Sequence, residues 1–404
     1  MIGTGAAARI RSVADAEDLA RRRLPRFLWE EYEGGAGAGV TLRANVRAFE
    51  EMAFRPRVAV FTPERDLRTR VLGHELAMPL MIAPTGLLRF GHSDGERGVA
   101  RAAGAAGTIQ IVSAASATPI EEVVAAASGP IFYQLYMFGG RASAEFQIER
   151  ARRAGCEALV LTVDQAGALP RERPHRHRAR RPASASVRQL LRVAPDLARH
   201  PRWLADFLRG GGSLEMPMAA LPDGTRRTVF DLFGAVLRPP QWQDVSWIRE
   251  RWARPLVIKG VLGTDDARRA VDAGADGIVV SNHGGNTLDG APATLRVLAE
   301  IVAVAGDRVE VLLDGGVRRG SDVVKAVALG ARAVLIGRAC VYPMLAAGEA
   351  GVRRILEILR TEIDQTLALL GAPSVNALDP SYLLMPDRPT GAPMAALSAA
   401  ERGP

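Results

Sequence analysis

The chain carries VEVLLDGGVRRG at residues 309–320 and AVLIGR at residues 333–338. In both segments a short apolar run leads into glycine and then arginine, as expected for a buried strand that ends in an anion-binding turn. Glycine at a strand end is often only a turn. Two such turns on consecutive strands, however, are typical of the phosphate site on the last two strands of a β/α barrel.

Six further apolar or β-branched runs precede this stretch and alternate with amphipathic runs that end in glycine, as in repeated β/α units. The eight predicted strands are residues 78–84, 108–113, 131–137, 158–163, 255–260, 277–282, 309–314 and 333–338. Helices are expected between them, for example over residues 94–106 and 265–273. The α/β pattern therefore favours a closed (β/α)8 TIM barrel over an open doubly wound sheet.

The remaining segments are expected to surround this barrel as parts of one domain over residues 1–390. Ser12 is a candidate N-cap for a helix through Arg23, and Pro25 can start a second helix; these helices would close the bottom of the barrel or flank its mouth. Residues 352–370 are predicted to form a long C-terminal helix, and residues 391–404 a flexible tail.

A long connection of about ninety residues separates the fourth and fifth strands, which predicts an active-site insertion or lid over residues 165–245. Residues 187–209 have helical spacing with basic and apolar faces. Packing over the barrel mouth is favoured for this segment over contact with a membrane or a partner.

Composition excludes several classes of function. Hydrophobic residues make up 48% and charged residues 24% of the 404 residues, as in globular proteins. The net charge is +8, yet aromatic residues are only 5%, and the densest basic run, RERPHRHRARR at 171–181, is typical of a solvated loop. No nucleic-acid partner is expected. Two cysteines in apolar stretches, with neither a signal peptide nor a membrane span, predict a cytoplasmic protein without a disulfide framework or metal site.

Barrel enzymes carry their catalytic groups at the carboxyl ends of the strands, so the residues there are the candidate site. These exits supply Pro84, Thr85, Gly86, Ser113, Gln134, Tyr136, Thr162, Asp164, Lys259, Ser281, Asn282, His283, Asp314, Gly316, Gly337 and Arg338. So many polar residues at the carboxyl ends of the strands predict a site for a small-molecule substrate.

Three motifs resemble one known family: LPRFLWEEYEGGAGAGVTLRAN at 24–45, SNHGGNTLDGAPAT at 281–294 and DGGVRRGSDVVKAVALGARAVLIGR at 314–338. They are similar to the FMN-dependent α-hydroxy acid oxidases and dehydrogenases, which include glycolate oxidase, lactate oxidase and mandelate dehydrogenase. The resemblance runs from about residue 12 to 375, in the order of the predicted strands. It implies an FMN-dependent oxidoreductase with one FMN per chain.

The resemblance also implies a role for each candidate in holding the cofactor. Pro84, Thr85 and Gly86 would lie along the flavin, Ser113, Gln134 and Thr162 would hydrogen-bond its ring, and Lys259 would face N1 and O2, with Ser281 nearby. Asp314 would hold the ribityl chain, and Gly316, Arg318, Gly337 and Arg338 the phosphate. A cation beside the ring stabilises the negative charge of reduced flavin.

His283 resembles the base of the family, and Asp164 the carboxylate that orients its imidazole. An isolated histidine is more often a core residue with its hydrogen bonds satisfied. Among the other candidate site residues, however, the ordinary histidine pKa near 6.5 suits a general base. Tyr136 matches a retained active-site phenol, and Arg171 matches one of two arginines that clamp the substrate carboxylate.

The chain departs from the family pattern at three pocket positions. Asn286 replaces the second clamp arginine, Glu31 replaces a tyrosine, and Ala115 replaces a large aromatic residue. Losing a cation and gaining an acid disfavours a carboxylate substrate and favours a neutral or amine-bearing group.

SNHGGN, HPRWLADFL and PPQWQDVSWIRERW are similar to the mycofactocin-pathway branch, which is associated with oxidative deamination of a peptide-derived aminopyrrolidinone. The leading hypothesis is therefore oxidation of a C–H bond next to an amine or hydroxyl in a natural-product intermediate. A conventional L-2-hydroxy acid oxidase or dehydrogenase that gives a 2-oxo acid is the alternative, and a non-redox isomerase the third possibility. Either O2 or a quinone or other redox partner would accept the electrons, and family resemblance predicts a homotetramer or octamer.

Overall fold

The computed structural model describes residues 2–137, 139–167, 171–172, 194–219, 225, 228 and 239–384. Eight parallel strands close into one barrel: β4 (Leu80–Ile82), β5 (Gln110–Ser113), β6 (Ile131–Leu135), β7 (Ala158–Thr162), β8 (Leu256–Val261), β9 (Gly277–Val280), β10 (Glu310–Asp314) and β11 (Ala333–Ile336). The ring closes where Val334 of β11 pairs with Leu80 of β4. The predicted TIM barrel and all eight predicted strands are confirmed.

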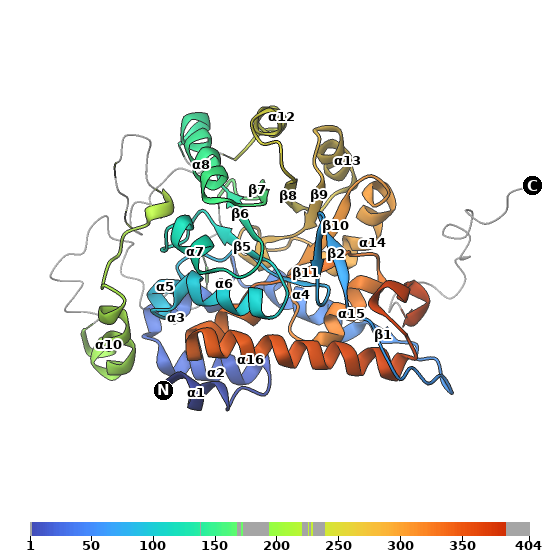
Figure 1. The fold of residues 1–404 in the computed structure, drawn as a ribbon, viewed down its shortest axis with the longest axis horizontal. Coiled ribbons are helices and arrows are strands. Elements are labelled where there is room, and N and C mark those ends of the chain that lie inside the picture. Colours follow the sequence, from blue (N-terminus) through green and yellow to red (C-terminus); the bar gives the residue numbers. More distant parts are fainter. Residues whose placement is uncertain are drawn as a thin grey trace, which may run out of the picture.

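Helices between the strands surround the barrel (Figure 1). They are α5 (Leu88–Gly91), α6 (Gly95–Ala105), α7 (Ile120–Ala126), α8 (Gly140–Ala154), α12 (Trp242–Arg251), α13 (Thr264–Asp272), α14 (Thr294–Ala305) and α15 (Gly320–Ala328). Alternate strand residues face opposite ways. Val160 and Val257 belong to the apolar cluster inside the barrel, whereas Leu161 and Ile258 belong to the cluster that the helices cover.

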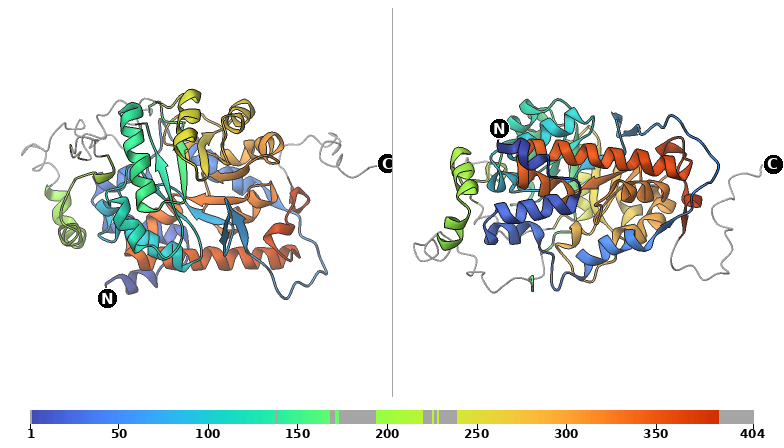
Figure 2. Two further views of the ribbon diagram at one scale, coloured as in Figure 1. Left: turned by 45° about the horizontal axis from the view of Figure 1, so that its top comes forward. Right: turned by 90° about the horizontal axis from the view of Figure 1, so that it is seen from below.

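Four helices precede the barrel: α1 (Ile2–Ala7), α2 (Val13–Arg23), α3 (Arg26–Glu33) and α4 (Val40–Glu51). Ser12 caps α2 as predicted, because its hydroxyl accepts a 3.1 Å hydrogen bond from the Asp15 N–H. The first two helices pack against the long helix α16, which runs along one side of the barrel (Figure 2). Helix α3 instead flanks the mouth, which was one of the two predicted positions.

A two-stranded hairpin closes the bottom of the barrel, and the sequence interpretation missed it. Its strands are β2 (Thr69–Val71) and β3 (His74–Leu76). Val71 and Leu76 pack into the cluster inside the barrel. The turn between them places Leu72 at φ 47° and Gly73 at φ 90°, so a leucine adopts a left-handed conformation that favours glycine.

The C-terminal helix is longer than predicted. Helix α16 runs over Arg338–Leu370, whereas residues 352–370 were expected, and a break at Gly348 (φ 64°, ψ −146°) separates its first part from the rest. After it, the chain wraps back, and β12 (Leu383–Leu384) pairs with β1 (Ala53–Phe54). The predicted tail at 391–404 lies outside the described residues.

The described part of the connection between β7 and β8 includes helix α10 (Pro201–Arg209) and the short turn η1 (Pro217–Ala219). Asp206 anchors α10, since its carboxylate accepts from Arg23 Nη2 at 2.6 Å and from the Ser93 hydroxyl at 2.6 Å. Helical spacing over 201–209 is confirmed, whereas residues 187–193 lie outside the described residues. The lid role of residues 165–245 stays a prediction.

Candidate active site

The predicted ring-binding side chains lie on neighbouring strands at the carboxyl end of the barrel. Ser113 of β5 pairs with Gln134 of β6, and Thr162 of β7 pairs with Lys259 of β8. The Ser113 hydroxyl donates to Gln134 Oε1 at 3.0 Å, which leaves the amide nitrogen of Gln134 to face a ligand. All four residues are buried, so the strand register alone brings these polar groups together.

His283 follows β9 in the turn η2 (His283–Gly285) and forms the centre of a polar triad. Its Nδ1 lies 3.0 Å from Asp164 Oδ1, and its Nε2 lies 3.3 Å from the Tyr136 hydroxyl. The backbone of His283 is left-handed, with φ 58°. A non-glycine residue held in that region is uncommon and is characteristic of functional sites. The Ser281 hydroxyl supports the turn by accepting from the His283 N–H at 3.1 Å.

Burial and neighbouring charges set the protonation states of two members of this triad, Asp164 and Tyr136. Burial by itself would raise the pKa of the Asp164 carboxyl, but the His283 imidazole and Lys259 outweigh it and hold that pKa below its ordinary value. Burial raises the pKa of the Tyr136 phenol, and the Asp164 charge adds to the shift. At neutral pH, Asp164 is therefore a carboxylate and Tyr136 a hydrogen-bond donor.

Lys259 is a buried cation beside this triad, with 3% of its surface exposed. Its Nζ donates to Ser281 Oγ at 2.8 Å and lies 3.0 Å from Asp314 Oδ2. Burial opposes the charge, but Asp314 and Asp164 outweigh it and raise the pKa of Lys259. The side chain thus stays positive at the place predicted for the electron-rich edge of the flavin.

Orphaned polar atoms mark where a ligand fits. Within the described residues, seven buried side-chain nitrogen or oxygen atoms lack a hydrogen-bond partner. Four of them belong to the predicted site: Gln134 Nε2, Thr162 Oγ1, Asp164 Oδ2 and Asp314 Oδ1. The other three lie on Trp29, Gln110 and Gln165. Buried polar groups are normally satisfied, so this group, with a donor, a hydroxyl and a nearby cation, fits the polar edge of a flavin and its ribityl chain.

The predicted phosphate end combines glycines with two helix starts. Gly315 and Gly316 have φ values of 91° and 90°. A methyl group on Gly316 would lie 2.3 Å from the carbonyl oxygen of Asn45, so only glycine fits. On Gly337, before α16, an added methyl would meet no atom within 4 Å. These turns fit a phosphate cradle built from backbone N–H groups.

The two arginines of the predicted phosphate site differ in their surroundings. The Arg318 guanidinium lies 5.9 Å from the centre of the Tyr342 ring. The Arg338 guanidinium instead donates to backbone carbonyls, among them Tyr32 O at 3.0 Å and Gly34 O at 2.7 Å. The Arg338 side chain is thus engaged by backbone carbonyls, while its backbone N–H stands at the start of α16, and the predicted role of Arg338 in holding the phosphate stays a prediction.

The loop after β4 carries Pro84, Thr85 and Gly86 and meets the loop after β5. The Leu87 N–H donates to Ala115 O at 3.1 Å. A methyl group on Gly86 would lie 2.5 Å from the same oxygen. Ala115, expected to open the pocket, therefore also leaves no room for a side chain at Gly86.

The substrate positions form two hydrogen-bonded groups at the mouth. Arg171 Nη1 lies 3.6 Å from Glu31 Oε2 and donates to Glu30 O at 2.8 Å. Asn286 donates to His283 O at 2.8 Å and accepts from Arg338 Nη2 at 3.1 Å. The structure thus brings the predicted anion against the one predicted clamp cation, and it ties Asn286 into the turn that carries His283.

A network that the sequence interpretation missed supports this turn. Asn45 and Asn282 exchange two 2.8 Å hydrogen bonds between their side-chain amides. The Thr294 hydroxyl donates to Asp314 O at 2.5 Å. Asn45 closes the motif at 24–45, while Asn282 and Thr294 lie in the motif at 281–294, so the motifs contained these residues but did not reveal that they pair.

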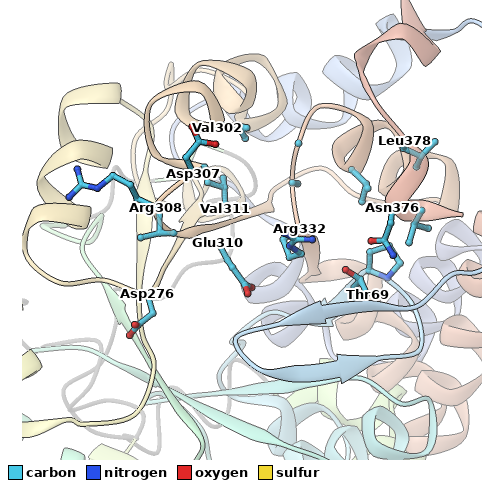
Figure 3. A pocket seen from close by; sticks show the side chains of 17 residues that line it. Thr69, Asp276, Val302, Asp307, Arg308, Glu310, Val311, Arg332, Asn376 and Leu378 are labelled. Atoms are coloured by element: carbon cyan, nitrogen blue, oxygen red, sulfur yellow. The ribbon is translucent and has the colours of Figure 1, made fainter. Parts of the chain in front are cut away.

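A hollow of about 640 Å³ lies at the other end of the barrel (Figure 3). Its lining includes Asp276, Glu310 and Arg332, which stand at the amino ends of strands, and Thr69 of the closing hairpin. None of the predicted site residues lines it. The candidate site is therefore the cluster around His283 and not this hollow.

Comparison with known proteins agrees with this geometry. Residues 20–385 match the model of the FMN-dependent dehydrogenase family. The chain belongs to this family. It is therefore an FMN-dependent oxidoreductase, as predicted.

Members of the FMN-dependent dehydrogenase family cover nearly the whole chain. Pre-mycofactocin synthase of Mycobacterium tuberculosis (strain CDC 1551 / Oshkosh) is 44% identical over 93% of this chain and 94% of its own. Peroxisomal (S)-2-hydroxyacid oxidase GLO3 of Arabidopsis thaliana is 38% identical over 92% and 96%. The crystal structure of the monotopic membrane protein (S)-mandelate dehydrogenase aligns with a TM-score of 0.86 and 37% identity, over 93% of this chain and 99% of that one. In this chain, no helix of the described residues has the length and apolar character needed to span a bilayer.

Proposed function

We propose that this chain oxidises a C–H bond next to an amine or hydroxyl of a natural-product or peptide-derived intermediate, with His283 as the base. The observation that carries the proposal is the His283 triad, which stands beside the orphaned polar atoms of Gln134 and Thr162. When bound there, FMN supplies a two-electron acceptor.

His283 is poised to take a proton at Nε2. The Asp164 carboxylate at 3.0 Å holds the ring proton on Nδ1, which leaves the Nε2 lone pair toward Tyr136 and the substrate. When the imidazole becomes positive, the adjacent carboxylate stabilises it. Tyr136, kept protonated by burial, has one O–H to donate, to Nε2 of His283 in the free enzyme or to the amine or hydroxyl of a bound substrate, which it would then orient.

Lys259 supports the reaction electrostatically. Its buried ammonium lies within 3.0 Å of both Ser281 Oγ and Asp314 Oδ2 and so points at a fixed place. With a flavin bound, this preorganised cation would stabilise negative charge on the ring without any reorganisation of solvent.

The side chains at the mouth of the barrel support a substrate class. Asn286 supplies no charge where a second arginine would clamp a carboxylate, and the charge of Arg171 is offset by Glu31. The 44% identity to pre-mycofactocin synthase supports a natural-product substrate. A conventional L-2-hydroxy acid oxidase is the second candidate, favoured by the retained Arg171 and Tyr136 and by the 38% identity to a plant (S)-2-hydroxyacid oxidase.

Flavin reduction by simple acids tests the substrate class. We expect lactate, glycolate and mandelate to reduce the enzyme poorly, because one lost charged hydrogen bond weakens transition-state binding about 10- to 150-fold. The double variant Asn286→Arg with Glu31→Tyr should gain activity with these acids. Wild-type efficiency equal to that of ordinary hydroxy acid oxidases would favour the second candidate.

His283→Gln tests the base. The variant should retain FMN, yet rapid-mixing reduction by any verified substrate should slow about 10²- to 10⁴-fold. A loss below tenfold would exclude His283 as the main base.

The setting of the enzyme is also part of the proposal. Cys156 and Cys340 are buried and unpaired, which supports a reducing cytoplasm. We place the chain there as a homotetramer or octamer that passes electrons to O2 or to a quinone or other redox partner. Gel filtration and anaerobic turnover with each acceptor distinguish these choices.

A further inference from the structure

Glu96 is a buried acid that the proposed reaction does not use. It lies in the first turn of α6, and 0% of its surface is exposed. Within the described residues it takes part in no ion pair. Buried charges are normally paired with an opposite charge or bound to a metal. A carboxyl group kept in such a place without a cation therefore indicates a role for its acceptor oxygens.

Uncharged donors surround this carboxyl group. The Thr118 hydroxyl donates to Oε2 at 2.6 Å, and the Ala117 N–H donates to Oε1 at 3.3 Å. Burial raises the pKa of Glu96, and its four hydrogen-bond donors, the Leu88 N–H among them, offset the rise only in part. Each of these groups donates, so the arrangement fits an acceptor-only carboxylate at the start of a helix.

The donors come from two loops at the carboxyl end of the barrel. The β4 loop, residues 83–87, leads into α5 at Leu88, and the β5 loop, residues 114–119, includes Ala117 and Thr118. Residues 84–86 of the β4 loop were predicted to lie along the flavin, and the β5 loop carries the predicted pocket residue Ala115. One carboxylate therefore binds both of these walls of the candidate site.

The β4 loop ends in a strained residue. Leu87 has φ 66°, a left-handed conformation that is uncommon for a residue with a side chain. Its N–H donates to Ala115 O at 3.1 Å, and its carbonyl accepts from the Tyr32 hydroxyl at 2.6 Å. Strained backbone persists only where the surrounding structure holds it from several sides. Glu96 adds to these contacts by accepting from the next N–H, that of Leu88.

The two loops also touch directly. A methyl group on Gly86 would lie 2.5 Å from Ala115 O and 2.7 Å from Ala115 Cβ, so a small shift of either loop changes the wall of the site. We propose that Glu96 is a positioning residue: its buried carboxylate holds the β4 loop against the β5 loop and thereby fixes the wall of the site along the flavin. The inference depends on the predicted place of FMN beside residues 84–86, and not on the proposed substrate reaction.

Thr118→Val tests the contact between the loops, because valine has nearly the shape of threonine but no hydroxyl. Hydrogen exchange of the FMN-loaded enzyme, followed by mass spectrometry, measures how often the β4 loop opens. We expect the amides of residues 87 and 88 to exchange about 10- to 150-fold faster, the range for loss of a hydrogen bond to a charged group. Glu96→Gln should act in the same way, since it puts an amide N–H2 among donors.

The bound flavin shows whether the position of the loop matters to the site. In Thr118→Val and Glu96→Gln, the visible circular dichroism and the reduction potential of FMN should both depart from the wild-type values, because the protein groups along the ring have moved. Thr118→Ser keeps the hydroxyl. It should restore the exchange rate, the dichroism and the potential together.

Thr108→Val is the matched control. Thr108 is also buried, and its hydroxyl donates to Leu80 O at the opposite end of β4 and β5. The control removes the same chemical group and should lower the unfolding temperature. It should leave exchange at residues 87 and 88, the dichroism and the potential at their wild-type values.

Three results would overturn the inference. The first is unchanged exchange at residues 87 and 88 in Thr118→Val. The second is faster exchange with unchanged dichroism and potential, which would make Glu96 a purely structural residue. The third is a change of the flavin in Thr108→Val as large as that in Thr118→Val. None of these measurements uses a substrate, so failure of the proposed reaction in the wild-type enzyme would leave the inference intact, and failure of the inference would leave the proposed reaction intact.

Discussion

Asp164→Asn isolates the electrostatic part of the base. The substitution keeps the size of the side chain and an oxygen near His283 Nδ1, but it removes the negative charge that the imidazolium faces after it takes a proton. We expect a slower proton-transfer step with little change in FMN content.

The distance between Asp164 and His283 gives the expected size of the rate loss. At 3.0 Å, a carboxylate and an imidazolium attract by about 5 kcal/mol at an effective dielectric constant near 20. The side chains are 22% and 11% exposed, and the amide retains a hydrogen bond, so we expect about half of this energy to be lost. A loss of about 2–3 kcal/mol slows the step about 30- to 150-fold.

Stopped-flow flavin reduction under anaerobic conditions measures this effect at saturating substrate. Because the protonated imidazole loses its partner, the acidic limb of the pH–rate profile should also move to lower pH. Asp206→Asn is the control, since it makes the same chemical change at the anchor of α10, and it should leave the profile in place. A loss below threefold for Asp164→Asn, or an unmoved acidic limb, would refute the reasoning.

Three further predictions concern the cofactor site and its acid. Lys259→Met should lower the flavin reduction potential, because it removes the cation beside the ring, and it should weaken FMN retention, because Asp314 is left buried without a countercharge. A redox titration in which the potential is unchanged would contradict this. Gly316→Ala should lose FMN and lower the unfolding temperature more than Gly73→Ala does. Both glycines have φ 90°, but only at Gly316 would an added methyl group meet a neighbouring atom. Equal decreases in unfolding temperature for the two variants would show that this steric clash does not matter. The lowered pKa of Asp164 contributes stability that is fully present above the ordinary carboxyl pKa of about 4. The difference in unfolding free energy between wild type and Asp164→Asn should therefore shrink as the pH falls below about 4, and a difference that grew below that pH would count against this reasoning.

The strands were predictable because each is a short apolar run with a polar exit, and burial on both faces requires that composition. The candidate site followed from the same rule, since parallel strands bring their carboxyl ends together. The N-cap at Ser12 was predictable for a local reason, because the hydroxyl and the Asp15 N–H lie within one turn.

The closing hairpin was missed because its turn pairs Leu72 with Gly73. A two-residue hairpin turn is recognised by residues that accept positive φ at both positions, and leucine is not one of them. The start of α16 at Arg338 was missed because Pro343 and Gly348 interrupt the helical pattern, although packing retains the helix on both sides of the break.

The side chains of Arg171 and Arg338 could not be placed from the sequence. Their acceptors include backbone carbonyls of α3, namely Glu30 O, which lies 141 residues from Arg171, and Tyr32 O, which lies 306 residues from Arg338 along the chain. Every residue has the same backbone carbonyl, so the residue type does not reveal which carbonyl accepts a hydrogen bond. Only the folded geometry shows that the helix end holds both guanidinium groups.

The separation between Tyr32 and Arg338 also orders the events of synthesis. A nascent chain emerges from its N-terminus at about 5–20 residues per second, so roughly 15–60 s pass between translation of Tyr32 and translation of Arg338. During that time the end of α3 lacks one of its two caps, and β4 waits for β11 as its partner across the closing seam of the barrel. The last strand and the second cap of α3 are therefore synthesised within a few residues of each other, and a chain that ends before β11 has neither.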